Sequence, residues 1–250
     1  MITRIYRVWH PFYLGIKISV TWLVMSKVVP FLKLCNVHTA LAVAGILGPI
    51  TLTVGDLSAG LASPGYSIIQ NSISSLALTS IGWVQTIGFL ALGLLVEIFT
   101  AGLLFNIKRG ARGFYLGIAI FVFFGFAMLL IGAFHTDATG TADAARTFDG
   151  RIHGFVASTA FLLFPIAILA LIPSIKKDPN WKYLYPYTLV AFILAVVLIV
   201  AVKLLPDTNM FFGLIERLLV ANMIIWIEVA AVNMFILSLK RKAKVESQEQ

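Results

Sequence analysis

Histidine and aspartate side chains recur in one polar segment of the chain, between residues 134 and 154. His135 and Asp137 are two residues apart, and Asp149 and His153 are four apart, which is the spacing of one helical face. Imidazole nitrogens and carboxylate oxygens are common ligands of divalent metals. His135, Asp137, Asp149 and His153 therefore predict a mixed metal site as one alternative. A haem between two imidazoles is a second, and solvated aspartates with histidines at helix ends are a third.

A serine-rich stretch, residues 64–83, supplies a second group of polar side chains. It reads PGYSIIQNSISSLALTSIGW and contains five serines and no Lys or Arg. Ile69, Ile73 and Leu76 recur at helical spacing, which predicts a short amphipathic helix between two membrane spans. No GxSxG pattern surrounds its serines, and the chain has no HExxH motif. The serines are therefore expected to line a polar site rather than to act as nucleophiles.

Two acidic residues, Glu97 and Glu228, lie inside long apolar runs. A charge near the centre of a bilayer is costly, so such residues are candidates for a functional role. One interpretation is a proton or ion path that uses both carboxyl groups. The other is a polar contact that holds neighbouring helices together.

The composition identifies the class of protein that must position these residues. The chain has 250 residues, is 60% hydrophobic and 12% charged, and has a mean hydropathy of +0.95. Soluble proteins average about 25% charged residues, so a soluble domain is excluded. Backbone groups inside a bilayer must hydrogen-bond internally, and the apolar runs are too long for alternating barrel strands. The sequence predicts an all-α, polytopic membrane helix bundle.

Six apolar runs are long enough to cross a bilayer. The predicted spans are residues 38–55, 83–105, 114–134, 152–173, 183–205 and 214–239. They form one membrane domain, residues 36–239. Residues 1–35 are predicted to be a cytoplasmic interfacial segment, although residues 12–34 could instead form a seventh span. Residues 240–250 are predicted to be a disordered basic and polar tail.

The distribution of basic residues predicts the orientation. Of the 19 Lys and Arg residues, fifteen fall in segments that lie on one side of a six-span layout, and four fall on the other. Basic residues concentrate in cytoplasmic loops, so both termini are predicted to be cytoplasmic in a cell membrane. Anionic lipid headgroups account for the net charge of +8 without a nucleic acid partner. The single cysteine, Cys35, excludes an intrachain disulfide.

Several ordered motifs resemble one known family. They are PGYS, ISSLAL and GWVQTIGFLALGLL after residue 63, FHTD at residues 134–137, the pair His153-Gly154, and GLIER at residues 213–217 with Trp226 beyond. Between about residues 40 and 239 the chain resembles domain-of-unknown-function family 998. The family commonly has a proline where this chain has Ala138.

The resemblance implies a multi-pass, mostly prokaryotic membrane protein with a six-span core and no established activity. A more distant similarity is to the six-span group of the Frag1, DRAM and Sfk1 proteins, which is linked to membrane-lipid biology. The family resemblance places the expected site in a prokaryotic plasma membrane. Membrane lipids are the expected partners, and the sequence identifies no protein partner.

These observations predict one shared polar pocket at the extracytoplasmic face. The candidate ligand-binding residues are Ser72, Ser74, Asp137, His153, Glu216 and Arg217. The leading hypothesis is a protein that binds a lipid or small ligand there. The alternatives are a metal- or histidine-assisted hydrolase of lipid headgroups, a transporter or proton path that uses Glu97 and Glu228, and a structural protein without a ligand.

Overall fold

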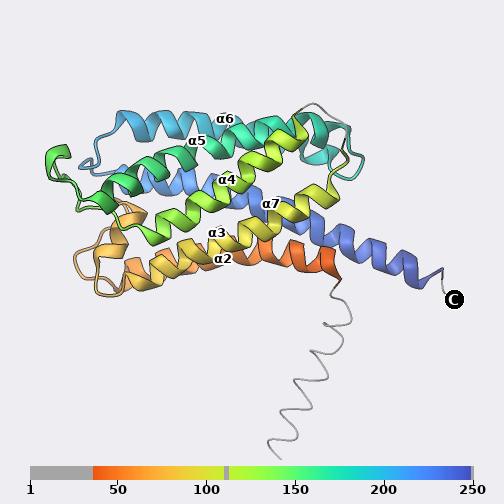
Figure 1. Cartoon of the computed structure of the whole chain (residues 1–250), viewed down its shortest axis with the longest axis horizontal. Helices are drawn as coiled ribbons and strands as arrows, with labels where there is room; N and C mark the ends of the chain where they lie inside the picture. The colour runs from red at the N-terminus through yellow and green to blue at the C-terminus, as the bar shows by residue number, and fades with distance from the viewer. Residues whose placement is uncertain (1–35, 110–112, 249–250) are drawn as a thin grey trace, which may run out of the picture.

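The computed structural model describes residues 36–109 and 113–248, and within these ranges the protein is an all-helical bundle without strands (Figure 1). Six of its helices are long and apolar enough to cross a membrane. They are α2 (Val37–Ala62), α3 (Trp83–Asn106), α4 (Phe114–Ala133), α5 (Phe148–Lys177), α6 (Tyr185–Leu204) and α7 (Phe212–Glu246). The predicted six-span all-α class is confirmed. The interfacial segment and the alternative seventh span predicted before residue 36 lie outside the described residues.

The six helices pack as a closed ring. Each helix contacts the next one along the chain, and α2 packs against α7 to close the ring. Figure 1 shows the connections α2–α3, α4–α5 and α6–α7 together at one end of the bundle. We call this the serine-loop end, because it carries the short 3-10 helix η1 (Ile73–Leu78). The opposite end is called the basic end.

Aromatic side chains fill the centre of the ring. Phe121 stacks on Trp226 with ring centroids 5.5 Å apart, and its edge contacts Phe99, Phe124 and Phe164. All five side chains are buried. Edge-to-face and offset-stacked rings are favourable beyond the area that they bury. The cluster fills the middle of the bundle, so a cavity at the serine-loop end does not continue through it to the opposite end.

The basic end is held together by one buried carboxylate. Asp178, which follows α5, accepts hydrogen bonds from the backbone N–H groups of Lys108 and Asn180 at 2.6 and 2.8 Å. Trp181 donates through Nε1 to the carbonyl of Asn106 at 3.1 Å. These bonds join the α3–α4 connection to the α5–α6 connection, which includes the short helix η3 (Lys182–Leu184).

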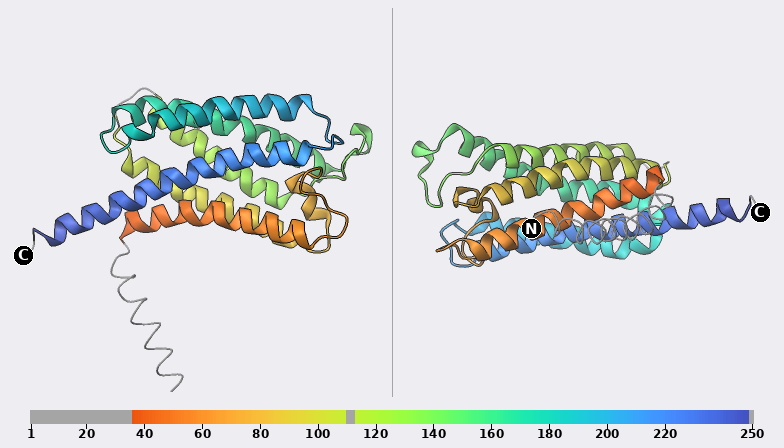
Figure 2. Two further views of the ribbon diagram at one scale, coloured as in Figure 1. Left: turned by 180° about the vertical axis from the view of Figure 1, so that it is seen from behind. Right: turned by 90° about the horizontal axis from the view of Figure 1, so that it is seen from below.

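Three helices extend well beyond their predicted bounds, and α5 does so by four residues at each end. Helix α2 continues seven residues past Gly55 to Ala62, because the charge of Asp56 is paired inside the protein instead of marking the bilayer boundary. Helix α7 continues past Leu239 to Glu246 and projects beyond the other helices at the basic end (Figure 2). The prediction of a disordered tail is therefore wrong for residues 240–246, which are good helix formers.

Candidate functional site

Arg217, in the second turn of α7, ties the serine loop (residues 63–82) to α2. Its Nε and Nη2 donate to the two carboxylate oxygens of Asp56 at 2.9 and 2.8 Å. Its Nη1 donates to the carbonyls of Ile68 and Asn71 in the loop at 2.7 and 2.8 Å. The side chains of Arg217 and Asp56 are only 12% and 11% exposed. This bidentate, largely desolvated pair fixes the loop against two helices.

Tyr66 completes this anchor. Arg217 donates through Nη2 to the Tyr66 hydroxyl, which in turn donates to the carbonyl of Ser72 at 2.8 Å. Gly65, just before it, has a φ of +76°, a conformation that favours glycine and turns the chain after α2. Burial raises the pKa of Tyr66, and the Arg217 guanidinium opposes the rise. The phenol therefore keeps its proton at neutral pH and remains a donor.

Glu216, the neighbour of Arg217, holds the same loop from inside the bundle. Its Oε2 accepts a hydrogen bond from the backbone N–H of Ile73 at 2.7 Å, at the start of η1. The backbone N–H of Leu214 donates to the carbonyl of Ile69 at 2.9 Å. The first N–H groups of a helix have no partner within it, so the serine loop also completes the hydrogen bonding of α7.

The α4–α5 connection is held by Asp137. Its Oδ1 accepts from the Thr147 hydroxyl at 2.8 Å, and its Oδ2 accepts from the Thr147 backbone N–H at 3.1 Å. The Thr147 oxygen also accepts from the backbone N–H of Gly150 at 3.0 Å, which caps α5. A Cβ at Gly150 would lie 2.0 Å from Asp137 Oδ2. This contact requires a glycine.

His153 is buried one turn into α5. Its Nδ1 lies 2.8 Å from the carbonyl oxygen of Phe134, the residue that ends α4. A carbonyl can only accept a hydrogen bond, so Nδ1 carries the proton and the neutral ring has its lone pair on Nε2. The ring therefore joins α4 to α5 and offers the cavity a hydrogen-bond acceptor.

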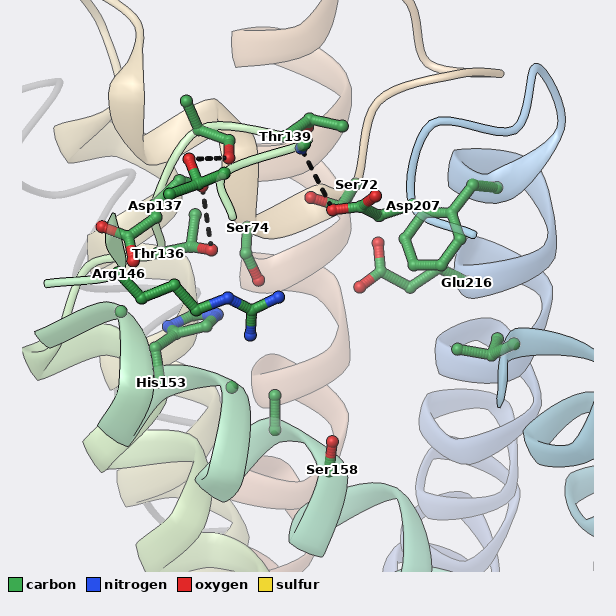
Figure 3. A pocket seen from close by; sticks show the side chains of 18 of the residues that line it. Ser72, Ser74, Thr136, Asp137, Thr139, Arg146, His153, Ser158, Asp207 and Glu216 are labelled. Carbon is green, nitrogen blue, oxygen red and sulfur yellow. Dashed lines mark hydrogen bonds between the residues drawn. The ribbon is translucent and has the colours of Figure 1, made fainter. Parts of the chain in front are cut away.

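A polar cavity of about 630 Å³ opens between these elements at the serine-loop end. Figure 3 shows side chains from the serine loop, the α4–α5 connection and α7 facing it. Its volume lies in the range of small-molecule sites, roughly 300–1,000 Å³. Five of the six predicted ligand-binding residues line it: Ser72, Ser74, Asp137, His153 and Glu216. The sixth, Arg217, is outside the lining, because its guanidinium is turned toward Asp56.

A second, apolar cavity of about 30 Å³ lies beneath the polar one. The two cavities share four lining residues: Ser74, Ala157, Phe161 and Glu216. Below this junction the walls are apolar, and Phe124 of the central aromatic cluster is one of them. Ser74 as a residue is only 9% exposed, and no group in the described part of the chain hydrogen-bonds its hydroxyl. A hydroxyl that is accessible from the cavity therefore lies where polar and apolar walls meet.

The four predicted metal ligands do not come together. Asp137 is engaged by Thr147, and His153 bonds a backbone carbonyl, whereas His135 and Asp149 are exposed. Asp149 lies in the first turn of α5, where a negative charge favours the helix. Within residues 36–109 and 113–248, no three His, Cys, Asp or Glu side chains are grouped to hold a metal ion.

The two predicted intramembrane carboxyl groups also lie apart. Glu97 on α3 faces α4, where a Cβ at Gly125 would lie 2.7 Å from its Oε1. Glu228 on α7 lines a groove of about 250 Å³ between α2 and α7, beside Pro49. The two groups therefore belong to different helix pairs rather than to one shared path.

Four charged residues of the polar cavity were absent from the predicted set. Asp143 and Arg146 lie in the α4–α5 connection, Lys203 on α6, and Asp207 in the α6–α7 connection. Arg146 and Lys203 are two of the four basic residues on the side where the charge bias predicts few. That exception to the bias is the sequence signal that would have identified them.

Comparison with known proteins identifies the family but no characterised relative. A family model described as a protein of unknown function, DUF998, matches residues 46–233. No curated protein and no solved structure matches the chain. The matched region contains the serine loop, the lining of the polar cavity and the Glu216-Arg217 pair. The chain therefore belongs to the DUF998 family of multi-pass membrane proteins of unknown function.

Proposed function

We propose that this protein binds a membrane lipid, or a similar amphipathic small molecule, by its headgroup in the polar cavity at the serine-loop end. The distribution of Lys and Arg predicts that this end is extracytoplasmic. The family resemblance implies that the membrane is a prokaryotic plasma membrane. The observation that carries the proposal is the junction at Ser74 and Glu216, where a polar cavity meets an apolar one.

The arrangement matches the two parts of an amphipathic ligand. Charged and hydroxyl groups in the upper cavity suit a headgroup, and the apolar cavity has room for only its first carbon atoms. Longer chains would leave sideways toward the bilayer, between α5 and α6. There Lys203 on α6 donates to the Ser158 hydroxyl on α5 at 2.9 Å across the rim of the cavity.

Binding is better supported than hydrolysis. A serine hydrolase needs a base within hydrogen-bond reach of its nucleophile. Among the described residues, no hydrogen bond joins His153 to Ser72 or Ser74, and the Ser72 oxygen instead accepts from the backbone N–H of Ser75 at 3.2 Å. The serines line the site, and the Nε2 lone pair of His153 can accept a hydrogen bond from a bound headgroup.

Native mass spectrometry of protein extracted in mild detergent tests this proposal. The wild-type protein should retain a lipid-sized ligand. Ser74→Leu should lose it, because the larger apolar side chain fills the junction between the cavities. Ala157→Phe, at the same junction, provides an independent obstruction on α5.

Ser80→Leu is the matched control, because Ser80 is exposed in the same loop and does not line the cavity. It should retain the ligand as the wild type does. Thermal unfolding should show that all variants remain folded. A wild-type protein that carries no lipid under these conditions, or equal retention in the folded variants, would contradict the proposal.

A further inference from the structure

We infer that the cavity selects a zwitterionic headgroup, a phosphodiester joined to a primary ammonium group. This inference rests on the proposed function, and it is carried by a separation of charge within the cavity. Figure 3 shows Arg146 reaching in from the side of His153, whereas Asp207 and Glu216 face it from the opposite side. Each pole has charged groups that the protein itself leaves partly unsatisfied.

Arg146 forms the cationic pole, and Lys203 on α6 is the second cation of the lining. Arg146 Nε lies 3.2 Å from Asp143 Oδ1, but that aspartate side chain is 94% exposed, so solvent weakens the pair. Among the described residues, no ion pair engages the terminal nitrogens of Arg146, and its Nη1 lies close to Gly154, which also lines the cavity. Within the described part of the chain, the partner of Lys203 is the neutral hydroxyl of Ser158. Both cations can therefore bind a phosphodiester.

The anionic pole consists of Asp207 and Glu216. Asp207 Oδ2 accepts from the backbone N–H of Gly140 at 3.2 Å, and Glu216 Oε2 accepts from that of Ile73 at 2.7 Å. These bonds orient both carboxyl groups and leave one oxygen of each for a ligand. Glu216 is only 8% exposed, so an unmatched charge there would be costly. A ligand ammonium would compensate it.

The remaining acidic groups do not change this balance. Both oxygens of Asp137 accept hydrogen bonds from Thr147, and Asp143 belongs to the solvent-exposed pair with Arg146. A ligand with phosphate alone would leave the anionic pole facing an anion. A ligand with an amine alone would leave the positive charge of Arg146 without an anionic partner. Only a ligand that carries both charges satisfies both poles.

A primary ammonium fits the anionic pole better than a quaternary one. It has three N–H donors for the free oxygens of Asp207 and Glu216. Quaternary ammonium groups are bound instead in cages of several aromatic rings. Among the described residues that line the cavity, two have benzyl side chains, Phe161 and Phe212, and they lie on different helices. The headgroup class is therefore an aminoalkyl phosphodiester such as phosphoethanolamine.

Calorimetric titration of the full-length protein in detergent tests this selectivity. The probes are short-chain lipids with identical acyl chains and phosphoethanolamine, phosphocholine or phosphoglycerol headgroups, together with soluble glycerophosphoethanolamine. We expect phosphoethanolamine lipid to bind about tenfold more tightly than phosphoglycerol lipid. Asp207→Asn should remove that preference, and Arg146→Gln should weaken both lipids. Asp149→Asn, an exposed carboxylate at the same end, is the control that changes neither.

The outcomes separate this inference from the proposed function. If phosphoglycerol or phosphocholine lipid binds as tightly as phosphoethanolamine lipid, the headgroup inference is wrong and lipid binding stands. If none of the lipids binds, both are wrong. If soluble glycerophosphoethanolamine binds as tightly as the lipid, the zwitterionic class stands and the lipid as its source is rejected.

Discussion

Arg217 and Asp56 form a bidentate ion pair between α7 and α2, although 161 residues separate them in the sequence. The pair closes the helix ring at the serine-loop end, where α2 meets α7. Arg217 also binds the loop carbonyls, so the same guanidinium positions the loop whose Ser72 and Ser74 line the polar cavity. Next to it, Glu216 binds the same loop through the Ile73 N–H and also lines that cavity. Two adjacent residues thus anchor the loop together, and one of them also forms part of the site.

The Asp56–Arg217 pair should contribute strongly to stability. Asp56→Asn should lower the free energy of unfolding by about 3 kcal/mol, because it leaves a desolvated guanidinium without its counter-ion. The double variant with Arg217→Gln should cost less than the sum of the two single variants. Unfolding in detergent measures all three. Glu246→Gln, in an exposed pair with Lys242 at 3.8 Å, should change stability by less than about 0.5 kcal/mol. If the stability losses of Asp56→Asn and Arg217→Gln add up to that of the double variant, this account is wrong.

The close approach of Gly150 to Asp137 predicts a sharp difference between two glycines of α5. Gly150→Ala should break the Asp137–Thr147 contacts, destabilise the protein by about 2 kcal/mol and reduce ligand retention, because its Cβ would collide with the carboxylate. At Gly154 the nearest atom to a Cβ is 3.9 Å away. Gly154→Ala should therefore be neutral or stabilising by about 0.5–1 kcal/mol. If both substitutions change the thermal midpoint equally, the close contact between Gly150 and Asp137 is wrong.

Tyr66 predicts a dependence of stability on alkaline pH. Tyr66→Phe should cost about 1–2 kcal/mol near neutrality, because Arg217 and the Ser72 carbonyl each lose a partner. Burial raises the folded-state pKa of Tyr66 above the unfolded value of about 10. The folded protein therefore holds this proton more tightly than the unfolded chain. The difference in stability between wild type and variant should be constant below about pH 10 and shrink as pH rises further. If the stability difference between wild type and Tyr66→Phe stays constant above about pH 10, the Tyr66 hydroxyl does not have this role.

The predicted orientation can be tested with single cysteines, since Cys35 is the only native one. In a Cys35→Ala background, a membrane-impermeant maleimide on intact cells should label Ser80→Cys at the serine-loop end. It should reach Lys176→Cys at the basic end only after the membrane is permeabilised. Both positions are exposed, so accessibility of the side chain does not limit labelling. The opposite pattern would invert the topology and place the cavity in the cytoplasm.

Local sequence patterns were sufficient to predict the helices but not the long-range contacts between them. The apolar runs identified all six spans, because a bilayer demands a continuous apolar helix. Asp56 was misread as the end of the first span, because its partner lies on the last helix. The charges after Leu239 were interpreted as disorder, although Lys and Glu favour a helix that leaves the membrane.

The same distinction applies to the site. Ser74, His153 and Glu216 were identified because the family motifs contain them, and they do line the cavity. Arg217 was assigned to the cavity because spacing along a helix does not reveal the direction of a side chain. Arg146 was missed because its position depends on how the α4–α5 connection folds back over α5, which Asp137 and Thr147 determine.

The central claim is that a lipid headgroup occupies the cavity at the Ser74–Glu216 junction. Its most direct test is photocrosslinking of the wild-type protein with a short-chain phosphoethanolamine lipid that carries a diazirine on the first carbons of its chain, followed by peptide mapping. We predict crosslinks at Ala157, Phe161 and Glu216 that an excess of unlabelled lipid removes. Crosslinks confined to lipid-facing positions such as Val197 on α6, unaffected by competition, would contradict the account.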